Sequence, residues 1–196
     1  MPGVRMKVRG VLGNVYDNFT RNSDPIQGSV TPVGSKTWIK QSTGDVVVKT
    51  AAGAIVAASG AASDMYLINA GSALYKVSFT VSAIRTNSGI PSFVFRATDE
   101  ADHIAVALRS NTVTPQYTLL RRRAGVNYNV LETGVVPKSG DRVTIVALTE
   151  TISLYVNGVL LGSSLIDGWL DKPLLGWRMF GTDTVTSFDD LSIFTA

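Results

Sequence analysis

The sequence predicts an all-β protein, a mostly antiparallel β-sandwich formed by a single domain. Short segments alternate between apolar and polar residues, as strands with one buried face do. Turn-forming residues separate these segments at intervals of roughly 8–12 residues, which is typical of sandwiches and barrels. No segment shows the apolar periodicity of an ordinary amphipathic helix. At 196 residues the chain has the length of one such domain.

The clearest strands lie in two parts of the chain. Residues 75–83 alternate almost perfectly between apolar and polar side chains. Residues 151–157 do the same and are followed by a turn at Asn157-Gly158, which is a strong hairpin signal. The predicted return strand is 159–161, and a strand at 143–147 precedes this hairpin, so the three strands form a meander. Further strands are predicted at 92–97, 104–109, 116–122, 128–132, 177–180 and 187–194. Residues 1–13 are expected to form an N-terminal arm before a sandwich domain at 14–196.

Composition narrows the class of protein. Only 17% of the residues are charged, below the roughly 25% of an average soluble domain, and the formal net charge of +3 does not indicate nucleic-acid binding. The absence of cysteine excludes disulfides, thiolate metal sites and a Cys nucleophile, and it favours synthesis in a reducing cytosol. No apolar run reaches bilayer length, and the N-terminus lacks the apolar core of a signal peptide. We expect a soluble protein that does not insert into membranes.

The residues do not predict an enzyme. Glycoside hydrolases need two carboxylates that flank the scissile bond, and the three glutamates of this chain are isolated from one another. Asp99, Glu100 and Asp102 come nearest to such a pair, but they lie in a predicted turn. His103 is the only histidine, and its phase opposes that of Ile104, so it should face away from the packed layer as a surface or hydrogen-bonded residue.

Two aspartates are predicted to point into the sandwich. Asp17 shares its phase with Val15 and Phe19, and Asp189 shares its phase with Leu191. A buried carboxylate needs a cation, an arginine or backbone N–H groups as a partner. Arg21 and Arg178 could supply the arginine, and a β-bulge would turn Asp189 outward instead.

Carbohydrate binding would require exposed aromatic rings beside amide or guanidinium groups. The weak candidates for such a site are Tyr117, Arg121, Tyr128, Tyr155 and Asn157. The alternative is that these tyrosines simply cover the second face of the sandwich. The tryptophans at 38, 169 and 177 are expected to be core or loop anchors.

Three consecutive arginines, Arg121 to Arg123, suggest an anion site at first sight. On a strand, however, Arg122 points away from its two neighbours, so the three do not form one patch. Charges on an edge strand also discourage unwanted sheet pairing, and we prefer that explanation.

Six segments, in this order and spacing, resemble a known family: 17–21, 37–38, 93–99, 141–143, 152–158 and 187–193. The chain resembles the concanavalin A-like lectin and laminin G-type jelly rolls, in particular those of phage minor tail proteins. The resemblance implies two curved antiparallel sheets with the first and last strands close together. Similar jelly rolls often hold a structural calcium ion near these ends, where Asp17 and Asp189 would be its ligands; no other cofactor is expected.

The resemblance also shapes the expected function, although one fold of this kind serves many functions. We expect a non-enzymatic structural or adhesion module of a virion, such as a minor tail, fibre or decoration protein. It would be made in the host cytoplasm, contact other virion proteins through the N-terminal arm, and self-associate as a homo-oligomer. Binding of host-surface polysaccharide is compatible with that role. The alternatives are a free-standing carbohydrate-binding module and a glycoside hydrolase that uses Asp99 and Asp102.

Overall fold

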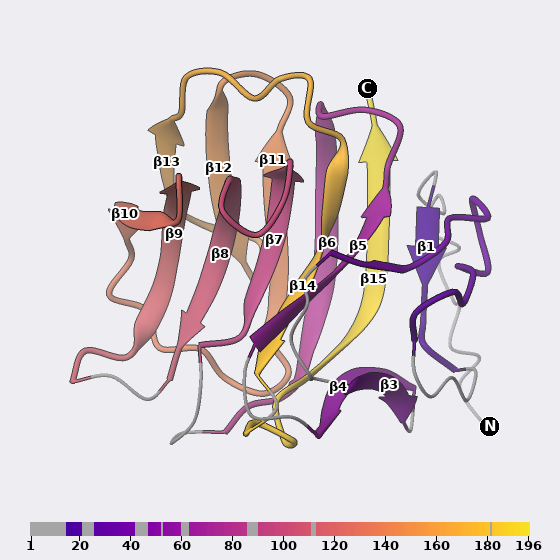
Figure 1. Ribbon diagram of the computed structural model, residues 1–196. Helices are drawn as coiled ribbons and strands as arrows, with labels where there is room; N and C mark the ends of the chain where they lie inside the picture. The colour runs from indigo at the N-terminus through magenta and orange to yellow at the C-terminus, as the bar shows by residue number, and fades with distance from the viewer. Residues whose placement is uncertain are drawn as a thin grey trace, which may run out of the picture.

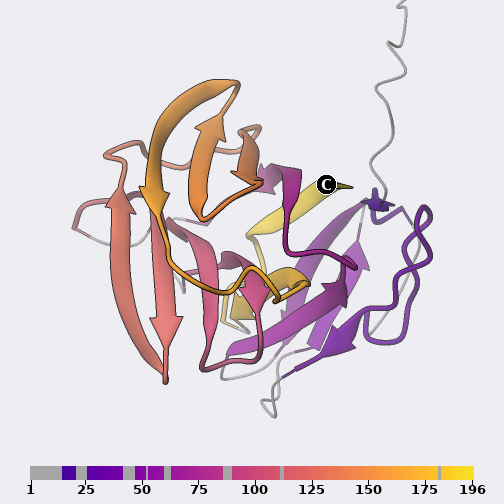
Figure 2. The same cartoon turned by 90° about the horizontal axis from the view of Figure 1, so that it is seen from above.

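The computed structural model describes residues 15–20, 26–41, 47–51, 53–59, 63–85, 90–110, 113–180 and 182–196. Within these ranges the chain forms fifteen strands and no helix, and accordingly none of its described elements is a helix that could cross a bilayer. Two antiparallel sheets pack face to face as a jelly-roll sandwich (Figures 1 and 2), which confirms the predicted fold class. The predicted arm at 1–13 and Arg21 lie outside the described residues.

The first sheet has eight strands. They are β1 (Val15–Asp17), β3 (Val47–Ala51), β4 (Ala54–Ser59), β6 (Tyr75–Ala83), β11 (Arg142–Ala147), β12 (Thr151–Val156), β13 (Val159–Leu165) and β15 (Ser187–Thr195). Their order is β13-β12-β11-β6-β15-β4-β3, with β1 paired to β15 beside this path. The pairing of β1 with β15 confirms that the first and last strands lie together, and β11-β12-β13 is the predicted meander.

The second sheet has seven strands. They are β2 (Ile39–Lys40), β5 (Ser63–Asn69), β7 (Ser92–Ala97), β8 (His103–Arg109), β9 (Gln116–Arg123), β10 (Val126–Glu132) and β14 (Leu174–Phe180). Their order is β10-β9-β8-β7-β14-β5-β2. In Figure 1 the β7–β10 strands of this sheet stand in front of the β11–β13 strands of the first sheet.

Aromatic rings from both sheets meet at the centre of the sandwich. Phe79 of β6 and Phe188 of β15 contact Phe93 of β7 and Trp177 of β14, with ring centroids 4.0 to 5.8 Å apart. All four side chains are fully buried. Such offset and edge-on pairs add about 0.5–1.5 kcal/mol each beyond the burial of apolar area. Trp38 is also fully buried, and Trp169 packs partly buried against the core, as expected for core or loop anchors.

The second sheet is buried on its outer face as well. A smaller apolar cluster covers that face and consists of Met65, Leu67, Val94, Ala97, Ala105, Ala107 and Leu120. Strand β5 therefore has five consecutive buried residues and no alternation. Period-two patterning requires one exposed face, so alternation gives no signal for β5, although β7 and β8 are buried on both faces as well and were nevertheless predicted.

Arg96 is a fully buried cation that ties β7 to the first sheet. Its backbone has a positive φ of 46°, at a point where the pairing of β7 with β14 shifts register. Its Nε donates to the carbonyl oxygen of Ala73 at 3.1 Å, and its Nη2 donates to those of Ala147 and Thr149 at 3.0 and 2.6 Å. Burial lowers the pKa of the guanidinium, so these carbonyl oxygens provide the compensation that a buried charge needs.

We predict that Arg96→Met lowers the free energy of unfolding by about 3 kcal/mol, because two buried carbonyl oxygens and one partly buried carbonyl oxygen lose a charged donor. Urea denaturation followed by tryptophan fluorescence measures this change. The exposed Arg123 is the matched control, and Arg123→Met should change stability by less than about 0.5 kcal/mol. Equal losses in the two variants would contradict the role assigned to Arg96.

Candidate functional site

A cavity of about 210 Å³ opens on the outer face of the second sheet. It is lined by Ile90, Ser92, His103, Ala105, Arg109, Leu120, Arg122, Asn127, Arg178 and Phe180. Strands β7, β8, β9, β10 and β14 all contribute to it. The alternation of side chains along each strand explains this arrangement, since the chain neighbours Phe93, Ile104 and Trp177 face the core. We call this cavity the arginine pocket.

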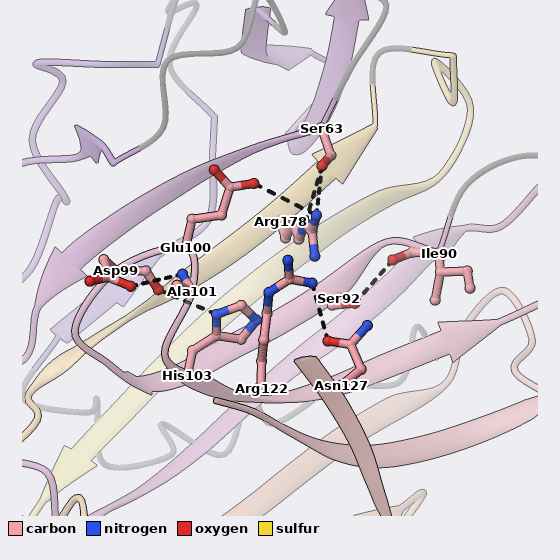
Figure 3. Close-up of polar contacts among 10 residues, drawn as sticks. All are labelled: Ser63, Ile90, Ser92, Asp99, Glu100, Ala101, His103, Arg122, Asn127 and Arg178. Carbon is pink, nitrogen blue, oxygen red and sulfur yellow. Dashed lines mark hydrogen bonds and ion pairs between the residues drawn. The ribbon is translucent and has the colours of Figure 1, made fainter. Parts of the chain in front are cut away.

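Three guanidinium groups line the arginine pocket. Arg178 donates from Nε and Nη2 to Ser63 Oγ at 3.2 and 2.9 Å, and its Nη2 lies 3.7 Å from the carboxylate of Glu100 (Figure 3). Arg122 Nη1 donates to Asn127 Oδ1 at 3.2 Å. Arg109 Nη2 donates to the amide oxygen of Asn129 at 2.8 Å. Each arginine is thus held in place through one end of its guanidinium.

These side chains leave positive charge and donor groups without full compensation. The Nε atoms of Arg109 and Arg122 are buried and have no hydrogen-bond partner. Burial, and next the positive charge of Arg122, lower the pKa of Arg178, while Glu100 opposes that change. Two like charges held close together destabilise each other unless an anion lies between them. The arrangement is therefore suited to an acceptor-rich or anionic ligand.

His103 lies on the floor of the arginine pocket, with 1% of its surface exposed. Its Nδ1 lies 3.3 Å from the carbonyl oxygen of Asp99, and Figure 3 shows the ring between that loop and Arg122. Burial lowers its pKa to about 4, with a smaller contribution from the charges of Arg178 and Arg122. The prediction that His103 faces away from the layer of Ile104 is confirmed, but the side chain is buried within the second face and not at the surface.

The predicted sugar-binding residues do not come together. Tyr117 is fully buried, and its hydroxyl donates to Asp141 Oδ2 at 2.8 Å. The expectation that its ring is exposed was wrong, because it faces the core between the two sheets. Arg121 and Tyr128 are cross-strand partners, with the guanidinium 5.6 Å from the ring centre. They form a separate pair at the end of β9 and β10, where Tyr128 is 47% exposed.

Tyr155 and Asn157 lie on the other sheet. Tyr155 is half-buried and lines a different cavity with Lys76 and Thr144. Asn157 has a positive φ of 52° in the hairpin turn, and its amide bonds to Asp141 and to the backbone of Arg142. Its side chain therefore holds the turn. A role of either residue in sugar binding stays a prediction.

The structure explains the buried carboxylate of Asp17 without an ion. Asp17 is fully buried as predicted, and its two oxygens accept hydrogen bonds from the backbone N–H of Phe19 at 2.9 Å and from the indole N–H of Trp38 at 3.0 Å. Of the partners that the sequence left open, N–H donors are the ones observed. Among the described residues no group of three potential metal ligands is found. A structural calcium ion at Asp17 stays a prediction from the resemblance.

Asp189 does not follow the predicted inward phase. The pairing of β15 with β6 shifts register between Asp189 and Ser192, and Asp190 has a positive φ of 51°. This irregularity places Phe188 and Leu191 in the core and leaves Asp189 half-buried, so the inward orientation expected for Asp189 was wrong. The bulge was the alternative that the sequence left open.

The arginine run follows the predicted strand phase, but β9 lies between β10 and β8, so the expectation that these charges protect an edge strand was wrong. Arg122 lines the arginine pocket, whereas Arg121 contacts Tyr128 and Arg123 is exposed. Strand phase alone did not predict that Arg122 lines the same pocket as Arg109 and Arg178. The available signal was their shared outward phase, but the order of strands in the sheet was needed to bring them together.

The carboxylates near this face have partners within the protein. Asp99 Oδ1 accepts the N–H groups of Ala101 and Asp102 at 2.7 and 3.0 Å, and Asp102 Oδ1 accepts that of Ala124 at 3.1 Å. Glu100 pairs with Arg178. These contacts confirm that residues 99–102 form a turn, and they account for each carboxylate structurally.

Known structures share this architecture at low sequence identity. The carbohydrate-binding module CBM66 from Bacillus subtilis is 12% identical over 81% of this chain and 95% of its own, with a TM-score of 0.63. Domain 4 of AbnA, a GH43 extracellular arabinanase from Geobacillus stearothermophilus solved with arabinotriose, is 14% identical over 93% and 92%, with a TM-score of 0.63. A Bacillus subtilis protein of unknown function with a galectin-like fold is 10% identical over 81% and 89%, with a TM-score of 0.59.

These likenesses show the jelly-roll fold, and they confirm the fold part of the resemblance. No protein-family model matches the chain, and no curated protein matches it. Solved carbohydrate-binding modules thus have this fold. The phage part of the resemblance stays a prediction.

We predict that the single histidine titrates with a pKa of about 4, below the ordinary value of 6.5. Because the unfolded chain binds the proton more readily, stability should rise from pH 4 to about pH 6.5 and contain no further histidine contribution above it. NMR of the His103 ring measures the pKa directly. In His103→Asn this part of the pH dependence should disappear, and a titration near 6.5 in the folded protein would contradict the assignment.

Proposed function

We propose that this domain is a non-catalytic carbohydrate-binding module and that its ligand occupies the arginine pocket. The observation that carries the proposal is the convergence of polar groups from five strands over an apolar floor. Ligand sites of proteins combine a mainly apolar lining with a few polar groups that fix orientation. The similarity to solved carbohydrate-binding modules supports the proposal at the level of the fold.

The lining suits a sugar ring in particular. Phe180 is half-buried at the pocket. The guanidinium of Arg178 lies 5.5 Å from the centre of its ring. Ala105 and Leu120 provide further apolar contact area. One face of a pyranose is apolar while its edge carries hydroxyl groups, so Phe180 and the floor would contact the face and Ser92 and Asn127 the hydroxyls.

The non-catalytic part of the proposal rests on the roles of the carboxylates. Glycoside hydrolysis needs two carboxyl groups about 5–9.5 Å apart, one of which must donate a proton. None of the ten residues that line the pocket is acidic. The nearby Asp99 and Asp102 are engaged in backbone hydrogen bonds. His103 is neutral at pH 7 and is not a ready proton donor.

A structural or adhesion role in a phage-type particle is the second part of the proposal, and the family resemblance supports it. One feature of the structure favours assembly. Strand β13 is an edge of the first sheet, and its Val159, Leu160 and Leu165 are 64, 51 and 66% exposed. Exposed apolar edges of this kind are found where a sheet contacts another protein.

We predict that Phe180→Ala weakens retention on the polysaccharide that the domain binds, because the sugar loses its stacking surface. Affinity electrophoresis against a panel of plant, bacterial and host polysaccharides measures retention. Tyr155→Ala and Tyr128→Ala are matched controls on other surfaces and should not change it. Loss with Tyr155→Ala alone would move the site to the first sheet, and no retention on any polysaccharide would reject the carbohydrate-binding proposal.

For the particle role, removal of residues 1–13 should abolish incorporation into particles while the sandwich stays folded. Complementation of a particle that lacks the protein, with circular dichroism on the purified variant, measures both. Unchanged incorporation would show that the arm is not the docking element.

A further inference from the structure

We infer that the arginine pocket recognises one sugar unit that carries an anionic group, a carboxylate or a sulfate ester. The inference rests on the proposed function and specifies the class of ligand. It follows from three features of the pocket: the charge of its lining, the balance of donors and acceptors, and its size.

The charged groups of the lining are all positive. Arg109, Arg122 and Arg178 come from β8, β9 and β14, and none of the lining residues is acidic. Glu100 neutralises part of the charge of Arg178, but its carboxylate is 3.7 Å away and 41% exposed. A ligand anion in the pocket would relieve the repulsion between Arg122 and Arg178.

Donors outnumber acceptors around the cavity. A guanidinium has five N–H donors and no acceptor. The oxygens of Ser63, Asn127 and Asn129 satisfy one end of each arginine, and two Nε donors are buried without a partner. The planar fork of an arginine matches the paired oxygens of a carboxylate or a sulfate. A sugar hydroxyl is both a donor and an acceptor, whereas a carboxylate or a sulfate only accepts and also carries the opposite charge, so the anionic group complements these donors better than a hydroxyl does.

The size of the cavity argues against a drug-sized ligand, and its apolar residues argue against a bare inorganic anion. At about 210 Å³ the cavity is smaller than the roughly 300–1,000 Å³ of sites for drug-sized ligands, so it accommodates one sugar unit of a chain. A bare inorganic anion would leave Ala105, Leu120 and Phe180 without a contact. The pocket therefore fits a sugar ring with an attached anionic group.

The test compares matched acidic and neutral sugars on the whole protein. Isothermal titration calorimetry is run with oligogalacturonate, with sulfated galactan oligosaccharides and with neutral galacto-oligosaccharides of equal length. We expect one of the two acidic series to bind at least tenfold more tightly than the neutral one, and which of the two binds identifies the anionic group. Arg122→Gln and Arg178→Gln should each weaken that binding roughly tenfold to a hundredfold.

Arg123→Gln is the matched control, because it removes the same charge from the same strand at an exposed position outside the pocket lining. It should leave the affinity within about twofold. Thermal melting of each variant verifies that the fold is intact. An equal loss in Arg123→Gln, or displacement of the acidic sugar by single-stranded DNA, would indicate non-specific polyanion binding and overturn the inference. Binding of neutral sugars alone would overturn the inference but leave the proposed carbohydrate-binding function intact. No binding of any sugar would reject both the inference and the proposed function.

Discussion

The packing of Trp177 against Phe79, Phe93 and Phe188 is the constraint on which the rest of the structure depends. These rings join the two sheets at the centre of the core, so they fix which face of β7 and β14 points inward. Since side chains alternate along a strand, the inward position of Trp177 directs Arg178 outward. The arginine pocket is therefore a direct consequence of core packing, and all of its lining residues except Ile90 lie on strands.

The second consequence is an unusual outer face of the second sheet. Its floor is closed by small and apolar residues, and the cations stand above that floor with little acidic compensation. Such an arrangement costs free energy, as the lowered pKa values of Arg178 and His103 indicate. Proteins retain charge arrangements of this kind mainly at functional sites, because a bound ligand recovers the free energy. Arg96 also has one unpaired buried nitrogen, but three carbonyl oxygens compensate its charge, whereas Arg109 and Arg122 each have one amide oxygen as a partner of the guanidinium.

Four aspartates of the described residues have structural roles. Asp17, Asp99, Asp102 and Asp141 all accept hydrogen bonds that hold a strand end, a turn or a ring in place. Carboxylates used in this way are poorly available for acid–base chemistry. The likeness to solved structures of 10–14% identity shows the fold alone. The specificity of the site must therefore be argued from its own side chains.

The sequence by itself determined the all-β class, most strands and the phase of several outward side chains. Alternation is a local property, so it correctly separated Arg122 from Arg121 and His103 from Ile104. Alternation gave no signal for β5, which has five consecutive buried residues, and it gave the wrong phase where a bulge intervenes, as at Asp189. Only the tertiary structure decided which outward side chains meet. Arg109, Arg122 and Arg178 lie far apart in the chain, and they share one pocket because the order β9-β8-β7-β14 brings their strands together by hydrogen bonds that no local pattern encodes.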